Sequence, residues 1–156
     1  MTQATERPAT GLECYLYYST GTYATPVLVQ ITRAINVSYS ISMTEADQRS
    51  RSSTWAKGRM THKELEITFT YRKKMGTDTV FDVLQAAALA GTVYEYFILD
   101  GIKTTSGIQG IRAFCQISSF SNTQDLASSE EVEFSLKPTY FEESNVEIDP
   151  IWYEVS

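Results

Sequence analysis

The sequence has little of the residue types on which most enzymes and metal sites depend. It contains two cysteines and one histidine in 156 residues, and no CxxC, HExxH or zinc-ligand spacing occurs. The single His62 has no evident partner for acid–base catalysis. The neighbouring acids Glu130 and Glu131 point to opposite faces if the chain is extended there, so they do not converge on a substrate. These absences predict a protein that is not an enzyme and that binds no metal or cofactor.

Long apolar runs are also missing. The most apolar window, residues 86–99, contains a glycine and a glutamate and is shorter than a membrane span. Residues 1–13 lack the basic and then apolar order of a secretory signal. Cys14 and Cys115 are therefore expected to be two unpaired thiols packed in the core of a protein made in a cytoplasm. No association with a membrane is expected.

The charges are unevenly distributed along the chain. The net charge is −6, in a composition otherwise ordinary for one globular domain. Residues 45–74 carry eight lysines and arginines, whereas from Asp125 onward nine acids face only Lys137. One interpretation is that the basic and acidic regions form two separate solvent-exposed faces of the molecule. A second interpretation is complementarity between copies, with the basic part of one molecule against the acidic part of the next.

The most informative segment is Glu45–Met60, EADQRSRSSTWAKGRM, which we call the arm. It separates two segments, 35–43 and 64–71, in which apolar and polar residues alternate as in half-buried strands. Paired strands need a turn of about two to five residues, and the arm is roughly three times longer. A polar segment with Trp55 as its largest apolar side chain buries too little surface to order itself. We interpret the arm as a contact element ordered by another copy of the protein.

The remaining pattern predicts antiparallel strands and one helix. Further strands are expected near residues 12–18, 27–31, 93–99, 111–120 and 131–140, with Asp100-Gly101 as a hairpin signal. The helix is expected between a cap at Thr77 or Asp78 and a stop at Gly91. The predicted fold class is mainly β: an antiparallel β-sandwich or partly closed barrel with one flanking α-helix and a long inter-strand arm. The expected organisation is a flexible N-terminus (1–10), one β domain (11–141) and an acidic C-terminal extension (142–156).

This order of parts resembles the major tail tube proteins of long-tailed bacteriophages, which are related in fold to the ring-forming tube protein of type VI secretion. The resemblance covers residues 11–141. It rests on TWAKGR (Thr54–Arg59), TDTVFDVLQAAALAG (Thr77–Gly91) and SSFSNTQDLASSEEVEFSLKP (Ser118–Pro138). It implies hexameric rings whose inner sheets join around a lumen, with the arm bridging successive rings. The acidic extension from Glu142 has no counterpart in that pattern.

The resemblance implies a structural virion protein that stacks into the tail tube, the conduit for DNA delivery. It would be located in the virion tail, with assembly in the host cytoplasm. Its partners would be further copies of itself, other tail proteins, and DNA that passes without specific binding. The implied inter-ring contacts of the arm are Arg49, Arg51, Trp55, Lys57 and Arg59. The candidate acidic partner surface is Glu130, Glu131, Glu133, Glu142 and Glu143. The candidate lumen-facing residues are Glu64, Glu66, Thr68 and Thr70, or alternatively Asn36, Ser38, Ser40 and Ser42.

Two other functions remain open at this point. The protein could be another ring-forming tail component, such as a terminator or a tube initiator, which shares the ring but does not polymerise. It could also be a β-sandwich nucleic-acid-binding module that uses the basic residues and Trp55 of the arm for phosphate and stacking contacts. The overall acidity opposes the second alternative.

Overall fold

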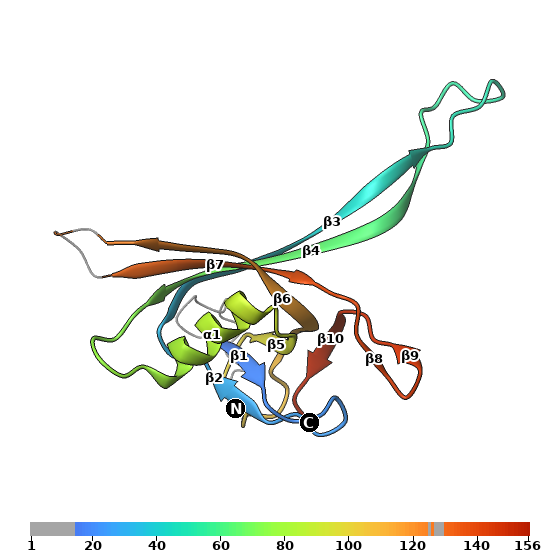
Figure 1. Cartoon of the computed structure of the whole chain (residues 1–156). Helices are drawn as coiled ribbons and strands as arrows, with labels where there is room; N and C mark the ends of the chain where they lie inside the picture. The colour runs from blue at the N-terminus through green and yellow to red at the C-terminus, as the bar shows by residue number, and fades with distance from the viewer. Residues whose placement is uncertain (1–14, 125, 127–129) are drawn as a thin grey trace, which may run out of the picture.

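The structure, a computed structural model, describes residues 15–124, 126 and 130–156 and is mainly β, with one helix beside the sheet (Figure 1). The predicted flexible N-terminus, the beginning of the predicted first strand and Cys14 lie outside the described residues. The elements are β1 (Tyr15–Ser19), β2 (Leu28–Gln30), β3 (Ala34–Asp47), β4 (Gly58–Arg72), α1 (Thr79–Ala90), β5 (Tyr94–Leu99), β6 (Gln109–Thr123), β7 (Glu131–Pro138), β8 (Glu142–Glu143), β9 (Val146–Glu147) and β10 (Ile151–Glu154).

The long strand β6 organises the sheet. The strand order is β2-β1-β5-β6-β7-β4-β3, and β10 pairs with β6 as well. The first half of β6 pairs with β5 and β10, and its second half pairs with β7 on both sides of a register shift between Ile117 and Ser119. A bulge bends a strand, so the sheet forms two layers. Among the described residues the end strands β2 and β3 do not pair with each other, so the sheet is an open sandwich and not a closed barrel.

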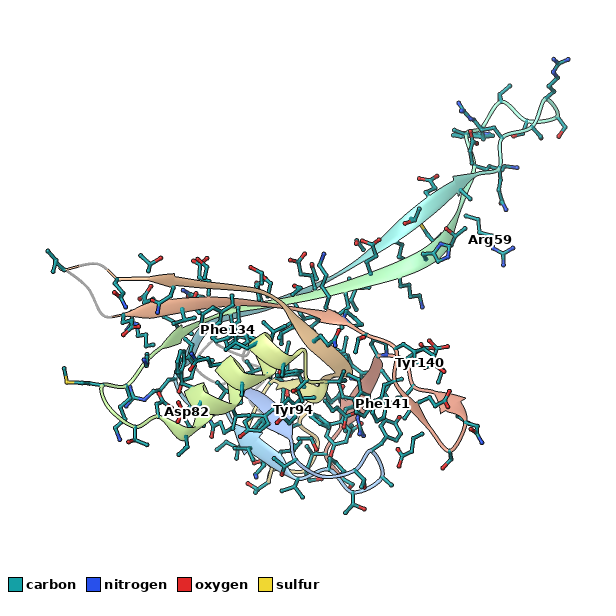
Figure 2. The ribbon with its side chains drawn as sticks, in the orientation of Figure 1. Arg59, Asp82, Tyr94, Phe134, Tyr140 and Phe141 are labelled. Carbon is teal, nitrogen blue, oxygen red and sulfur yellow. The ribbon has the colours of Figure 1, made fainter. Side chains whose placement is uncertain are left out.

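The main core lies between the two layers and the helix. β4 and β7 each contribute one apolar face, with Ile67, Phe69 and Phe134 almost fully buried. Phe134 lies between the long sheet and α1 in Figure 2, where it stacks on Phe69 at 5.1 Å. β1 is buried on both faces, because Leu16 joins this core whereas Tyr17 packs with a second cluster around Phe97.

The helix begins and ends where local chemistry predicts. Asp78 is the N-cap and accepts a hydrogen bond from the Phe81 backbone N–H at 3.2 Å. Gly91 closes the helix with φ 67°, the left-handed conformation that glycine adopts without strain. The buried face consists of Phe81, Leu84 and Ala87. The expectation of one flanking helix is confirmed.

The C-terminal residues fold as part of the sandwich. β8 and β9 form a short hairpin joined by a two-residue turn. Both turn residues, Ser144 and Asn145, have positive φ, as two-residue hairpin turns favour. β10 then pairs with β6 and packs Tyr153 against Phe97. The Asp100-Gly101 hairpin signal, in contrast, marks only the beginning of a longer connection, residues 100–108, between β5 and β6.

A buried ion pair fixes β10 and a nearby loop to the sheet. Arg112 on β6 donates to Glu95 on β5 through Nε at 2.8 Å and Nη2 at 2.7 Å, and both side chains are buried. The same guanidinium lies over the rings of Tyr23 and Tyr153, at 4.3 and 5.3 Å from their centres. A buried charge needs such partners to offset its desolvation. Arg112 therefore joins β5, β6, β10 and the loop of Tyr23.

Cys115 is an unpaired thiol buried in the core, and burial raises its pKa to about 12, so it remains protonated. Within the described part of the chain, no group of three or more His, Cys, Asp or Glu side chains is arranged to hold a metal ion. No described helix has the length and hydropathy to cross a bilayer.

Candidate assembly surfaces

One face of the layer formed by β3, β4, β7 and β6 is polar. The register of β3 with β4 pairs Ser40 with Glu66 and Ser42 with Glu64. Ser38 stands opposite Thr68, and their hydroxyls form a 2.7 Å hydrogen bond. The two sets of candidate lumen-facing residues are thus not alternatives, because they belong to a single face. Asn36 is the exception, since it has φ 52° and lies at the register shift between Ile35 and Ser38.

The polar face continues across β7 and β6. Ser135 and Glu133 of β7 pair with Thr68 and Thr70 on one side. On the other side they pair with Ser119 and Ser121 of β6. The face therefore consists mainly of hydroxyl and carboxylate side chains. The charged residues at these alternating positions of β4 and β7 are Glu64, Glu66, Glu131, Glu133, Arg72 and Lys137.

The arm is an extension of β3 and β4 beyond the body of the molecule (Figure 1). The two strands pair out to Asp47 and Gly58, so the part without strand pairing is residues 48–57, shorter than the alternation predicted. A register shift after Thr44 breaks the alternation there, and Thr61 donates its hydroxyl to the Thr44 carbonyl. The arm is thus a projecting hairpin with an irregular tip.

The five predicted contact residues of the arm are all on this projection, but they are not equivalent. Arg49 folds back on Asp47, with its Nη2 at 2.6 Å from the carboxylate, and this bond lowers the pKa of Asp47. Trp55 is 76% exposed, which is unusual for the largest apolar side chain. Arg59, labelled in Figure 2, projects from the base of the arm. Arg51, Lys57 and Arg59 form no salt bridge within the described residues, so they remain available to a partner.

The candidate acidic partner surface is divided between two places. Glu130, Glu131 and Glu133 lie at the start of β7, at the end of the sheet opposite the arm (Figure 1). Glu142 and Glu143 lie in β8, in a different part of the molecule. The sequence order of these acids does not reveal this separation.

Two acids in the first of these places already have partners within the molecule. Glu130 accepts a hydrogen bond from Asn122 at 2.8 Å, which lowers the pKa of its carboxyl group. Glu131 contacts Arg72, with Nε at 3.3 Å from the carboxylate. Leu126, in the connection between β6 and β7, is fully exposed. This end of the sheet therefore offers a mixed polar and apolar surface.

The exposure of the apolar side of β3 is a feature that alternation alone did not identify. Tyr39, Ile41 and Met43 share one face, as predicted, yet they are 39%, 51% and 50% exposed. β3 is 14 residues long and ends the strand order, so its outer edge has no partner strand among the described residues. The second half of β6 forms the other open edge of this layer, with Phe120 40% exposed there. A long open edge with exposed apolar side chains is typical of a surface that pairs with another chain.

The fold of this chain matches solved structures from phage tails and related particles. A chain of the SPP1 tail tube matches with a TM-score of 0.72 at 14% identity, over 94% of this chain and 80% of that one. A chain of the native gene transfer agent virion gives 0.64 at 13% identity, over 83% and 93% of the two chains. A chain of the sheath–tube complex of PVC, an extracellular contractile injection system, gives 0.65 at 13% identity, over 99% and 100%.

No family model matches the sequence, and a search of curated proteins finds no significant match. The similarity of this chain to known proteins is therefore seen in its structure and not in its sequence. It confirms the predicted fold class and the predicted likeness in fold: this chain has the tail tube fold, a β-sandwich with a flanking helix and a projecting arm.

Proposed function

We propose that this protein is a structural component of a phage or phage-like tail, which forms rings that stack into a tube. The observation that carries the proposal is the layer β6-β7-β4-β3, which has a polar face and two open edges. A sheet with both edges open is completed when identical copies pair edge to edge in a ring. Six copies per ring are proposed, in line with the sixfold symmetry used for the gene transfer agent tail, whose fold this chain shares.

The ring contact would join β3 of one copy to the second half of β6 of the next. This is a heterologous contact, which generates a ring when the rotation between copies closes. The exposed stripe Tyr39, Ile41 and Met43 would then be covered by Phe120 and by Leu89 of the adjacent helix, itself 83% exposed. Burial of these side chains provides a driving force of about 25 cal/mol per Å² of apolar surface.

The axial contact would use the arm. The arm and the β6–β7 end of the sheet lie at opposite ends of the molecule (Figure 1), so a repeat along the sheet brings the arm of one copy to that end of the next. Trp55 is the candidate anchor, because aromatic side chains dominate interface energies. Arg51, Lys57 and Arg59 would contact the acids at the start of β7.

The polar face would line the lumen. Its carboxylates and hydroxyls offer few cations to neutralise phosphates, so DNA would pass without being held. We place the protein in the virion tail, with assembly in the host cytoplasm and other tail proteins at the ends of the tube. In this proposal the polar face acts as the wall of the conduit.

Electron microscopy of the purified protein tests the proposal. We expect rings or tubes with a central hole for the wild type. Trp55→Ala and deletion of residues 50–57 should leave a folded protein that forms no tubes, because the changes affect only the exposed arm. Trp152→Ala is the matched control, since Trp152 is 59% exposed and lies on β10, away from the arm. Rings that never stack would instead support a terminator or initiator, and tubes formed without the arm would contradict its assignment.

A further inference from the structure

The C-terminal hairpin, which comprises β8, β9 and their turn (residues 142–147), has no role in the contacts proposed above. It lies on the body of the molecule, on the opposite side of the long sheet from its polar face, at the end toward the arm (Figure 1). Tyr140, just before the hairpin, is 65% exposed, and Val146, in β9, is 63% exposed. Figure 2 shows Tyr140 and Phe141 where the chain enters the hairpin.

The hairpin is firmly held by the body. Phe141 stacks on Phe114 of β6, with ring centres 3.8 Å apart. The Ile148 N–H donates to the Phe141 carbonyl at 2.8 Å, which closes the base of the hairpin. β10, which follows it, is fixed by pairing with β6 and by the edge-to-face contact of Tyr153 with Phe97. A rigidly mounted surface loses little conformational entropy when it binds a partner.

The acids on this hairpin are not neutralised internally. Glu142 accepts a hydrogen bond from the Tyr140 hydroxyl, which raises the pKa of that phenol. Glu142, Glu143 and Glu147 form no salt bridge with any lysine or arginine in the described residues. Acids and exposed apolar side chains together favour a partner that offers both cations and an apolar group.

The molecule carries such a surface at its opposite end. The connection between β4 and α1, residues 73–78, lies on the same side of the long sheet as the hairpin and at the other end of the body (Figure 1). We call it the basic loop. Lys74 is exposed, and Met75 is 96% exposed. The Lys73 ammonium lies 4.7 Å from the centre of the Phe81 ring, and neither lysine forms a salt bridge among the described residues.

We propose that the C-terminal hairpin of one copy docks on the basic loop of the next copy along the tube. The inference rests on the proposed function, because it requires copies that repeat along the sheet direction. In that repeat each junction has two charge-complementary contacts: the basic arm against the acids at the start of β7, and the acidic hairpin against the basic loop. The second contact lies farther from the polar face, on the outer part of the ring.

The basic loop has a geometry suited to such a contact. The Lys74 N–H donates to the Asp78 carboxylate at 3.2 Å, so the loop is tied to the helix cap. Gly76 has φ 83°, and a Cβ added there meets no atom within 4 Å, so the loop is open on that side. The loop thus presents Lys73, Lys74 and Met75 from a fixed base.

Charge reversal tests the proposal. Glu142→Lys with Glu147→Lys should raise the critical concentration for tube growth by about tenfold or more, because like charges would then face each other at every junction. Lys73→Glu with Lys74→Glu should have the same effect. The variant that combines all four changes should recover tube growth, since the pair is restored with inverted sign. Glu154→Lys, on β10, is the control for a charge change outside the hairpin and should have little effect.

The outcomes separate this inference from the proposed function. If tubes require the arm but grow normally with either charge-reversed pair, the hairpin contact is wrong and the tube assignment stands. If the four-change variant fails to recover while its circular dichroism and thermal unfolding match the wild type, the contact is also wrong. If the wild-type protein forms no rings or tubes under any condition, the proposed function itself fails.

Discussion

At the scale of single residues, Asp78 holds three parts of the chain together through one carboxylate. Its carboxylate accepts from the Phe81 and Lys74 backbone N–H groups and from the buried Tyr71 hydroxyl, which lies 2.8 Å from both oxygens. Burial, the largest single influence, disfavours its ionised form, but these three donors and the charge of Arg33 together outweigh burial, so the pKa of Asp78 lies below its ordinary value of 3.8. One side chain therefore connects β4, the basic loop and α1.

Substitution of Asp78 should reveal this role in stability and in its pH dependence. Asp78→Ala removes the cap and leaves the Tyr71 hydroxyl unpaired, so we expect a loss of about 2 kcal/mol in the free energy of unfolding at pH 7. Asp78→Asn keeps a capping oxygen and should cost less. Because the folded-state pKa is lowered, the charge contributes fully above the unfolded-state pKa, and its contribution disappears as the pH falls through the folded-state value.

Urea unfolding at pH 7 and at pH 3 measures this contribution. The difference in stability between the wild type and Asp78→Asn should shrink at the lower pH. If the difference in stability stays constant between the two pH values, the negative charge of Asp78 does not contribute to it. The matched control is Asp82→Asn, since Asp82 also lies in the first turn of α1 but is exposed (Figure 2).

At the scale of elements, the proposed pairing of the open edge strand β3 predicts which variants can form rings. Ile41→Lys places a charge in the exposed apolar stripe, whereas Ser40→Lys places it one residue earlier on the polar face. Both positions are exposed, so both monomers should keep their stability within about 0.5 kcal/mol. Ile41→Lys should prevent ring formation because the charge would be buried at the contact, and Ser40→Lys should permit it. Light scattering coupled to size exclusion measures the assembly state, and equal behaviour of the two variants would contradict the ring contact.

The elements also show what sequence could and could not predict. The helix was predictable because its cap, apolar stripe and stop are local, and residues 78–91 contain all three. The C-terminal hairpin was not, because its turn depends on positive φ at Ser144 and Asn145, which is not a strong sequence signal. Asp100-Gly101 correctly marked the end of β5 and its antiparallel pairing with β6, but it did not give the length of the connection, which runs from residue 100 to 108.

The candidate surfaces were predictable residue by residue but not in their arrangement. Alternation identified both polar sets on β3 and β4, yet only the register, Ser40 with Glu66, shows that they share a face. Alternation also marked Tyr39, Ile41 and Met43 as apolar without showing that nothing in the same chain covers them. Pairing of distant strands depends on tertiary contacts that a local pattern does not contain.

At the scale of the whole molecule, the charges of the sequence are distributed so that each end of the body carries one basic and one acidic surface. The arm and the basic loop are at opposite ends of the body, and each of them lies at the same end as one acidic surface (Figure 1). A molecule with the same sign at both ends would repel its own copies in a stack. Here each basic surface would face an acidic surface of the next copy, one pair near the polar face and one pair farther from it. Two such contacts favour one direction of stacking and one angular alignment between rings.

The polar face gives the prediction that most directly tests the conduit role. Glu64→Lys with Glu66→Lys changes the face from acidic to basic without altering the apolar side of β4, so tubes should still form. Tubes assembled with short DNA duplexes should then retain the DNA and protect it from nuclease, and the retention should weaken steeply as salt is raised. Asp82→Lys with Glu154→Lys reverses the same number of charges on exposed positions outside the polar face, and DNA bound there should remain open to nuclease. Protection by the second variant and not by the first would place the lumen on a different face of the sandwich, because only DNA enclosed by the ring is shielded along its whole length.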